Sequence, residues 1–149
     1  MRTDFAFEAR VSVGEPQDLG ETPVGRRRIV PIIGGTFAGP RLKGTVMPGG
    51  ADWQVVRPDG VSELEARYWL KTDDDVTISV LNLAKRRAAP DVAARLLAGE
   101  LVDPALYYFR GTPSFLAPAG RYDWLTRSVF VAECERQPSV VIVRVLEVL

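Results

Sequence analysis

The chain of 149 residues contains no histidine and only one cysteine, Cys134. These absences exclude zinc sites built on histidine or on several thiolates, iron sites with two histidine ligands, and catalytic triads with a histidine base. They also exclude an internal disulfide. Any chemistry must therefore use Asp, Glu, Lys, Arg, Tyr, the single Cys or backbone groups.

Long apolar runs are also absent, since none approaches the ~20 residues that a membrane-spanning helix needs. The first residues, MRTDFAFEARVSV, alternate in polarity and do not show the charged head and apolar core of a signal peptide. The 19 basic residues balance the 19 acidic ones. We therefore expect a cytoplasmic protein with one domain, residues 1–149, that binds neither nucleic acid nor membranes.

Apolar and polar residues alternate along much of the chain, which is the pattern of half-buried strands. The run 4–13 places Phe5, Phe7 and Ala9 on one face, and the run 62–72 behaves in the same way. Further strands are predicted at 26–37, 41–48, 52–57, 76–84, 105–111, 128–136 and 139–149. One short helix is predicted around 90–98, where Asp91 lies near its start and Gly99 ends it, and 15–25 is predicted to be a polar loop.

This order of elements predicts an all-β, mainly antiparallel fold of eight to nine strands with one short helix. Several strands, such as RIVPII and VVIVRV, are apolar on both faces, so both faces must be covered. Many short strands also leave edges that a closed sheet removes. We therefore favour a small closed or nearly closed β-barrel over a β-sandwich.

The stretch GGTFAGPRLKGTVMPGGADWQ, residues 34–54, raises the question of a phosphate-binding loop. Such a loop needs a strand, then glycines, then the N-terminus of a helix, and no helical pattern or Gly-Lys-Ser/Thr follows here. Glycines within strands more often mark bulges, barrel corners or close approach of a ligand. The sequence thus argues against nucleotide binding and predicts strand bends.

Three charged clusters and the cysteine have simple explanations. The basic runs 25–28 and 85–87 lack interleaved aromatic residues, so they do not indicate a nucleic-acid site. The acidic run TDDDV, residues 72–76, lacks the spacing of a calcium loop and is predicted to be a solvated turn. Cys134 is expected to pack in the core.

Two short stretches carry candidate site residues. Asp52 and Trp53 are neighbours, so on a regular strand they point to opposite sides. Either Trp53 belongs to the core and Asp52 caps a turn, or Asp52 faces a cavity. Arg110 needs an acidic partner or an anionic ligand if it is buried, and Glu133 offers a structural partner.

Four blocks of the sequence together resemble a known family. They are IIGGTFAGPRLKGTVMPGGADWQ, RYWLKTDDD, YYFRGTPSF and YDWLTRSVFVAECER. In order and spacing they are similar to the bacterial and fungal family called domain of unknown function 3237, or uncharacterised protein family 0311. The resemblance covers almost the whole chain. It implies a small antiparallel β-barrel that often forms oligomers and has no settled biochemical role.

The chain departs from the usual pattern of this family at positions where glycine is typical. These positions hold Asp75, Ala84, Ala132 and Cys134. The family motif N-x-G-x-R is otherwise kept, with Asn82 and Arg86 at its ends. If the family's glycines admit a ligand, the side chains of Ala132 and Cys134 would narrow or reshape the cavity.

From the resemblance and the candidate residues we expect a barrel cavity that holds a small carbonyl-bearing or aromatic molecule. The expected catalytic residues are Asp52, Glu133 and Tyr108, and the expected ligand-binding residues are Trp53, Tyr68, Arg110, Trp124 and Asn82. Without histidine or nucleotide motifs, we expect no metal and no cofactor, which leaves cofactor-independent proton transfers: isomerisation, dehydration, cyclisation or lyase steps. The alternatives are a binding protein without turnover and an oligomeric scaffold. A homodimer is the expected assembly.

Overall fold

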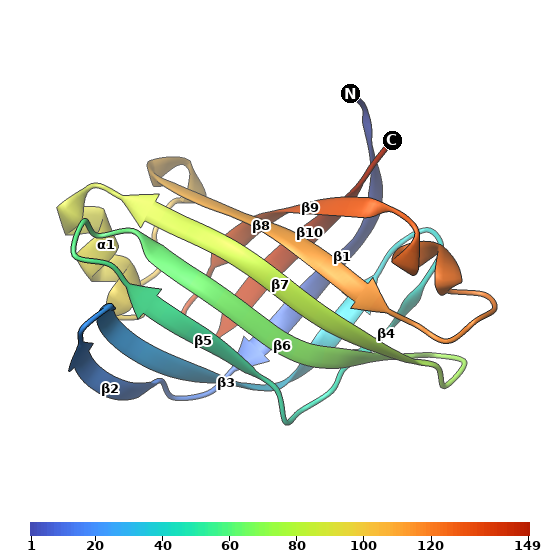
Figure 1. The fold of residues 1–149 in the computed structure, drawn as a ribbon, viewed down its shortest axis with the longest axis horizontal. Helices are drawn as coiled ribbons and strands as arrows, with labels where there is room; N and C mark the ends of the chain where they lie inside the picture. Colours follow the sequence, from blue (N-terminus) through green and yellow to red (C-terminus); the bar gives the residue numbers. More distant parts are fainter.

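A computed structural model describes all residues, 1–149, and consists mostly of antiparallel strands (Figure 1). The alternation of polarity in the sequence accounts for most of them. The strands are β1 (Thr3–Val13), β2 (Gln17–Thr22), β3 (Gly25–Ala38), β4 (Lys43–Val46), β5 (Ala51–Val56), β6 (Ser62–Thr72), β7 (Thr77–Ala88), β8 (Tyr107–Leu116), β9 (Val129–Arg136) and β10 (Val140–Val148). The helices are α1 (Pro90–Leu97) and two short 3₁₀ turns, η1 (Pro104–Leu106) and η2 (Asp123–Thr126).

The strands form one sheet that closes on itself. Neighbouring strands follow the order β1-β10-β9-β8-β7-β6-β4-β3, and β1 also pairs with β3, which closes the ring. Strands β4 and β5 both pair with β3 and β6, so they share one position in the ring. The result is a closed antiparallel barrel with eight strand positions, as the sequence predicts, and β2 lies outside the ring on β3.

One end of the barrel, which we call the closed end, is filled by aromatic side chains. Phe7, Phe37, Phe115 and Phe130 make edge-to-face contacts with ring centroids 5.1–5.7 Å apart. The η2 turn adds Leu125, which is 1% exposed and belongs to the same apolar core. Interlocking aromatic rings of this kind bury large apolar area and leave no channel through this end.

The opposite end, which we call the mouth, lies where β7 ends and β8 begins, and the connection between them carries α1 (left in Figure 1). Val92 and Leu96 of α1 pack with Val102 in a small apolar cluster of their own. The helix begins at Pro90 and is followed by Gly99 with φ of 80°, as its sequence signals predict. No helix in the structure has the length and apolar character needed to cross a membrane.

One detail differs from the sequence prediction, and another agrees with it. The segment 15–25, predicted to be a loop, contains β2, whose residues are exposed or only partly buried. The predicted bend in the glycine-rich segment is present as a register shift between β1 and β3. Gly35 is required there, because its φ is 131° and a Cβ atom would lie 2.0 Å from the carbonyl oxygen of Arg10.

Candidate functional site

The middle of the barrel holds a small, mostly apolar cavity of about 40 Å³. Small side chains on neighbouring strands leave this space, among them Ala66, Ala84 and Cys134. Gly111 also contributes, because a Cβ atom at this position would lie 2.4 Å from Oδ1 of Asn82. A cavity of this size accommodates one or a few waters and is too small for a whole organic ligand.

Asp52 is the one carboxylate on the inner wall of this cavity. On β5 the alternation turns Asp52 and Gln54 inward, and Gln54 Nε2 donates a 2.9 Å hydrogen bond to Asp52 Oδ2. The other carboxylate oxygen, Oδ1, is buried and has no hydrogen-bond partner. Burial raises the pKa of Asp52, although the bond from Gln54 and the nearby arginine charges act in the opposite direction.

Three arginines surround Asp52 on the mouth side: Arg28 on β3, Arg86 on β7 and Arg136 on β9. Arg86 and Arg136 are only 6% and 9% exposed. None of the three has a carboxylate oxygen within 4.0 Å. Burial, and then the positive charges of its two neighbours, lower the pKa of Arg86 to about 10.

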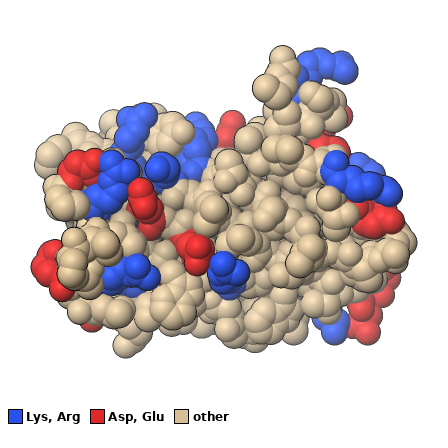
Figure 2. Space-filling model, in the orientation of Figure 1, with Lys and Arg blue, Asp and Glu red and all other residues tan.

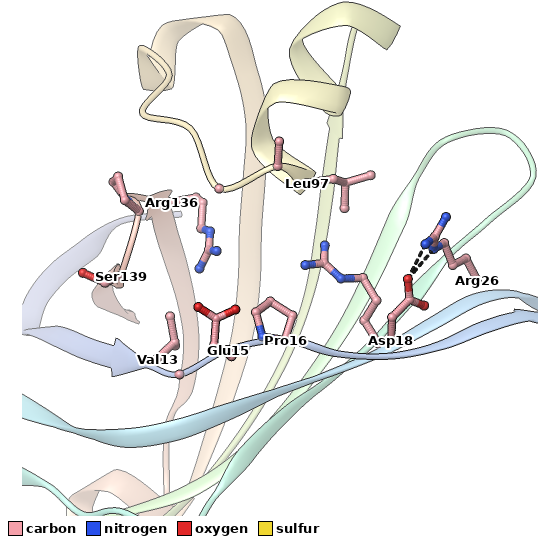
Figure 3. Close-up of a pocket in the computed structure, with 13 residues that line it drawn as sticks. Val13, Glu15, Pro16, Asp18, Arg26, Leu97, Arg136 and Ser139 are labelled. Carbon is pink, nitrogen blue, oxygen red and sulfur yellow. Dashed lines mark hydrogen bonds and ion pairs between the residues drawn. The ribbon is translucent and has the colours of Figure 1, made fainter.

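At the mouth, Arg28 and Arg136 line an open pocket of about 830 Å³ (Figure 3), whereas Asp52 and the buried Arg86 are not among its lining residues. Arg136 and Glu15 both point into this space in the figure, while Arg26 lies at the rim in an ion pair with Asp18. Leu97, at the end of α1, forms part of the apolar wall. The site thus combines an open pocket, a layer of buried positive charge and a deeper buried carboxylate.

Of the predicted site residues, the structure brings Asp52, Tyr68 and Asn82 together on the inner wall of the barrel. All three belong to the inward-facing positions of their strands. Tyr68 is buried among apolar groups, which raises the pKa of its hydroxyl. Asn82 Oδ1, like Asp52 Oδ1, is buried without a hydrogen-bond partner. These unpaired oxygens are the polar groups that the cavity offers to a ligand or water.

The prediction that Trp53, Tyr108, Arg110 and Glu133 line the cavity was wrong. Trp53 and Tyr108 are each 41% exposed, and Arg110 and Glu133 are exposed on the outside of the barrel. The physical reason is the alternation of side chains along a strand, which turns the direct neighbours of inward residues outward. Arg110 lies opposite Glu133 in the β8–β9 pairing, but the two form no ion pair within 4.0 Å.

Trp124 is buried, but it lies in η2 at the closed end of the barrel and not at this site. Its ring packs against Phe130 at a centroid distance of 6.0 Å and is covered by the guanidinium of Arg41 at 3.7 Å. Trp124 therefore caps the aromatic core and does not line the cavity.

Sequence reasoning missed the three arginines of the mouth as site residues. Arg28 and Arg86 lie in the basic runs 25–28 and 85–87, which the sequence led us to consider only as a possible nucleic-acid site and to set aside. A usable signal was present, because Arg86 is four residues from Asn82 on the same strand and so faces the same side. Arg136 ends an apolar strand and gives no comparable signal.

The positions where the family usually has glycine fall into two groups. Asp75 has φ of 68°, a conformation that glycine adopts without strain, so the glycine preference there belongs to a turn. Ala84 and Cys134 line the small cavity, and Ala132 is buried in the core beside it. These side chains occupy space that glycine would leave open.

Fold and site together define a closed antiparallel β-barrel with one charged mouth. The chain belongs to the family described as "Protein of unknown function (DUF3237)", which matches residues 1–148. A UPF0311 protein of Rhodopseudomonas palustris (strain TIE-1) is 37% identical over 149 residues, covering 100% of this chain and 97% of that protein. This confirms the resemblance drawn from the sequence blocks.

Solved structures show the same barrel. A conserved protein of unknown function from Rhodopseudomonas palustris superposes with a TM-score of 0.97 at 37% identity, covering 99% of this chain and 97% of that one. A β-barrel like protein from Acinetobacter baumannii AYE has a TM-score of 0.86 at 34% identity, with 98% and 94% covered. An enzyme from Penicillium herquei shares the fold at 19% identity, with a TM-score of 0.70 and 97% and 93% covered.

Proposed function

We propose that this protein binds a small carbonyl-bearing or aromatic metabolite in the mouth of the barrel and that Asp52 acts on it as an acid and base. The observation that carries this proposal is the state of Asp52. Its carboxylate is buried, its pKa is raised, and its Oδ1 is free of protein partners on the wall of the small barrel cavity. Groups with these properties in a cleft are candidates for catalysis.

The proposed chemistry is a proton transfer next to a carbonyl group. Ionised Asp52 takes a proton from the carbon beside the carbonyl, and the electron pair of the broken C–H bond moves to form an enolate. Protonated Asp52 then returns the proton to a different carbon or to the oxygen, so the molecule is isomerised without loss of atoms. A carboxyl group with a raised pKa serves both steps near neutral pH, and the hydrogen bond from Gln54 holds it in place.

The likeness to the Penicillium herquei protein supports only the general idea. That protein is described as an enzyme, so a barrel of this shape carries a reaction in at least one other chain. The support for a reaction in this chain comes from its own Asp52 and mouth pocket.

A second candidate, a non-catalytic homodimer, is favoured by one feature of the outer surface. Charges cluster toward the ends of the face shown in Figure 2, and an uncharged area lies between them. Trp69 and Leu116 are 37% and 72% exposed, and Ser79 of β7 lies between them in the sheet. An apolar sheet face of this kind suits contact with a second copy of the chain. Light scattering on the wild type and on Trp69→Glu tests it: a monomeric wild type contradicts the dimer.

The test of the catalytic proposal begins with the ligand. Protein is incubated with a metabolite extract, and the retained small molecule is identified by native mass spectrometry. That molecule is then incubated in D₂O with wild-type protein, with Asp52→Asn, and with Glu133→Gln as a control for an exposed carboxylate. We expect deuterium uptake or product formation with the wild type and Glu133→Gln, and a loss of about 100-fold or more with Asp52→Asn. Equal rates in all three proteins would remove Asp52 from the mechanism.

A further inference from the structure

We infer that Arg28, Arg86 and Arg136 form a binding site for an oxyanion, a carboxylate or a phosphate, carried by the organic ligand. The anionic group would lie among the three guanidinium groups at the mouth, and the rest of the molecule would extend toward Asp52. The placement of the reacting part of the ligand near Asp52 rests on the proposed function. The anion site itself is tested by binding alone.

The first argument is a contrast among the arginines of this protein. Several arginines at the surface have carboxylate partners, such as Arg57 with Glu63 at 3.0 Å and Arg127 with Asp123 at 2.9 Å. Others, such as Arg110, face water. The buried Arg86 has no carboxylate partner. Arg86 is therefore an exception to the usual rule that surface charges can be left to water whereas buried charges are paired. A buried guanidinium without a protein partner indicates that its partner is a ligand.

The second argument concerns the two carboxylates that could neutralise the cluster. Asp52 is more than 4.0 Å from every guanidinium, and one of its oxygens accepts the bond from Gln54. Glu15 points into the pocket (Figure 3) but is exposed and belongs to no ion pair. Even with both Asp52 and Glu15 ionised, three positive charges face two negative charges, so the mouth has a net positive charge that an anion would balance.

The third argument is that the site has the shape for an organic anion and not only for an inorganic ion. The pocket of about 830 Å³, which Arg28 and Arg136 line and Arg86 does not, is in the size range of small-molecule sites. Leu97 on one side and Val13 on the other supply apolar contact area. Guanidinium groups match the planar, two-oxygen geometry of carboxylates and phosphates. Arg86 also packs on the ring of Phe109 at 5.4 Å, which helps to fix its direction.

The experiment uses matched probes on the whole protein. Benzoate and benzamide have the same shape and differ in charge, and phenyl phosphate offers the second type of oxyanion. Binding is measured by isothermal titration at neutral pH and low salt, with wild type, Arg86→Met and Arg136→Met, and with the outer-face variant Arg110→Met as control. We expect benzoate or phenyl phosphate to bind at least about tenfold more tightly than benzamide, and each mouth variant to weaken the anion about 10- to 100-fold.

The outcomes separate the possibilities. Tighter binding of phenyl phosphate than of benzoate assigns the site to phosphate esters, and the reverse assigns it to carboxylic acids. Equal affinity for benzoate and benzamide, no binding of either anion at millimolar concentration, or an effect of Arg110→Met as large as that of Arg86→Met overturns the site. Anion binding that persists in Asp52→Asn, together with unchanged turnover in that variant, refutes the acid–base proposal and leaves the anion site standing.

Discussion

Replacing Arg86 by methionine is expected to stabilise the ligand-free protein. Methionine keeps an unbranched apolar stem that packs against Phe109. It also removes the charge of Arg86, a residue that is 6% exposed and has no carboxylate partner. The folded protein holds this guanidinium at a pKa of about 10, against the ordinary value of 12.5. Folding therefore releases the proton between these two values, and at neutral pH the whole cost of burying the charge is present.

The size of the effect follows from this difference in pKa. At about 1.4 kcal/mol for each pKa unit, a fall from 12.5 to about 10 corresponds to a cost of about 3 kcal/mol. The loss of contact between the Arg86 cation and the ring of Phe109 offsets about 1 kcal/mol of the gain. We expect a net increase of about 2 kcal/mol in the free energy of unfolding, or about 4–8 °C in Tm for a chain of this length.

The assay is urea unfolding at pH 7 in a buffer without carboxylate or phosphate, so that no oxyanion occupies the mouth. The slope of the unfolding free energy against urea should stay constant while the midpoint rises. Arg110→Met, on the outer face of β8, is the matched control and should change stability by less than about 0.5 kcal/mol. A loss of stability in Arg86→Met, larger than that of the control, would refute the reasoning, because it would show that a protein group balances the Arg86 charge.

Three further predictions concern other polar groups. Asp52→Asn should raise the free energy of unfolding at pH 7, because the folded-state pKa of Asp52 lies above its ordinary 3.8; the gain should shrink and vanish as pH falls below that value. Gly111→Ala should destabilise by about 1–3 kcal/mol, since its Cβ would lie 2.4 Å from Oδ1 of the buried Asn82. The Tyr122 hydroxyl donates a 2.6 Å hydrogen bond to Asp74 and lowers the pKa of Asp74 to about 2. The wild type loses the stability from this contact as pH falls toward 2. Asp74→Asn should therefore be less stable than the wild type at neutral pH, and the difference should disappear at low pH.

Urea midpoints across a range of pH check the two aspartate variants, and a single neutral pH suffices for the glycine variant. Gly14→Ala is the control for the glycine, because the nearest atom to its added Cβ lies at 3.4 Å, an ordinary contact. The argument for Asp52 is contradicted if Asp52→Asn is less stable than the wild type at pH 7, and the argument for Gly111 if Gly111→Ala is as stable as the wild type. The argument for Asp74 is contradicted if the stability of Asp74→Asn and of the wild type falls in parallel as the pH is lowered.

Strand prediction from the sequence succeeded where one face of a strand is buried and the other is not. In β6, for example, Leu64 and Tyr68 point inward and Glu63 and Arg67 outward, and this alternation is written directly in the sequence. Strand β2 was missed because neither of its faces reaches the core, so its polar residues carry no alternation. The family resemblance supplied the closed barrel, which no local pattern specifies.

The candidate site was predicted less well, because side chains alternate along a strand and a shift of one residue in this alternation moves a residue to the other face. For β5 the sequence left open whether Asp52 or Trp53 faces inward, and the glycines before it hide the phase. The structure turns Asp52 inward and leaves Trp53 41% exposed. The arginine cluster joins β3, β7 and β9, and contact between such distant segments is a property of the closed barrel alone.

The pairing of β1 has a consequence for how the chain is made. This strand precedes the other strands along the chain, and it pairs along one edge with β3 and along the other with β10, which follows all of them. Until β10 is made, the growing sheet has two open edges, β1 and β9, whose Val and Phe side chains favour wrong pairing with other chains. The ring therefore closes only after β10 has been synthesised, and a nascent chain that stalls before β10 is the form most prone to aggregate.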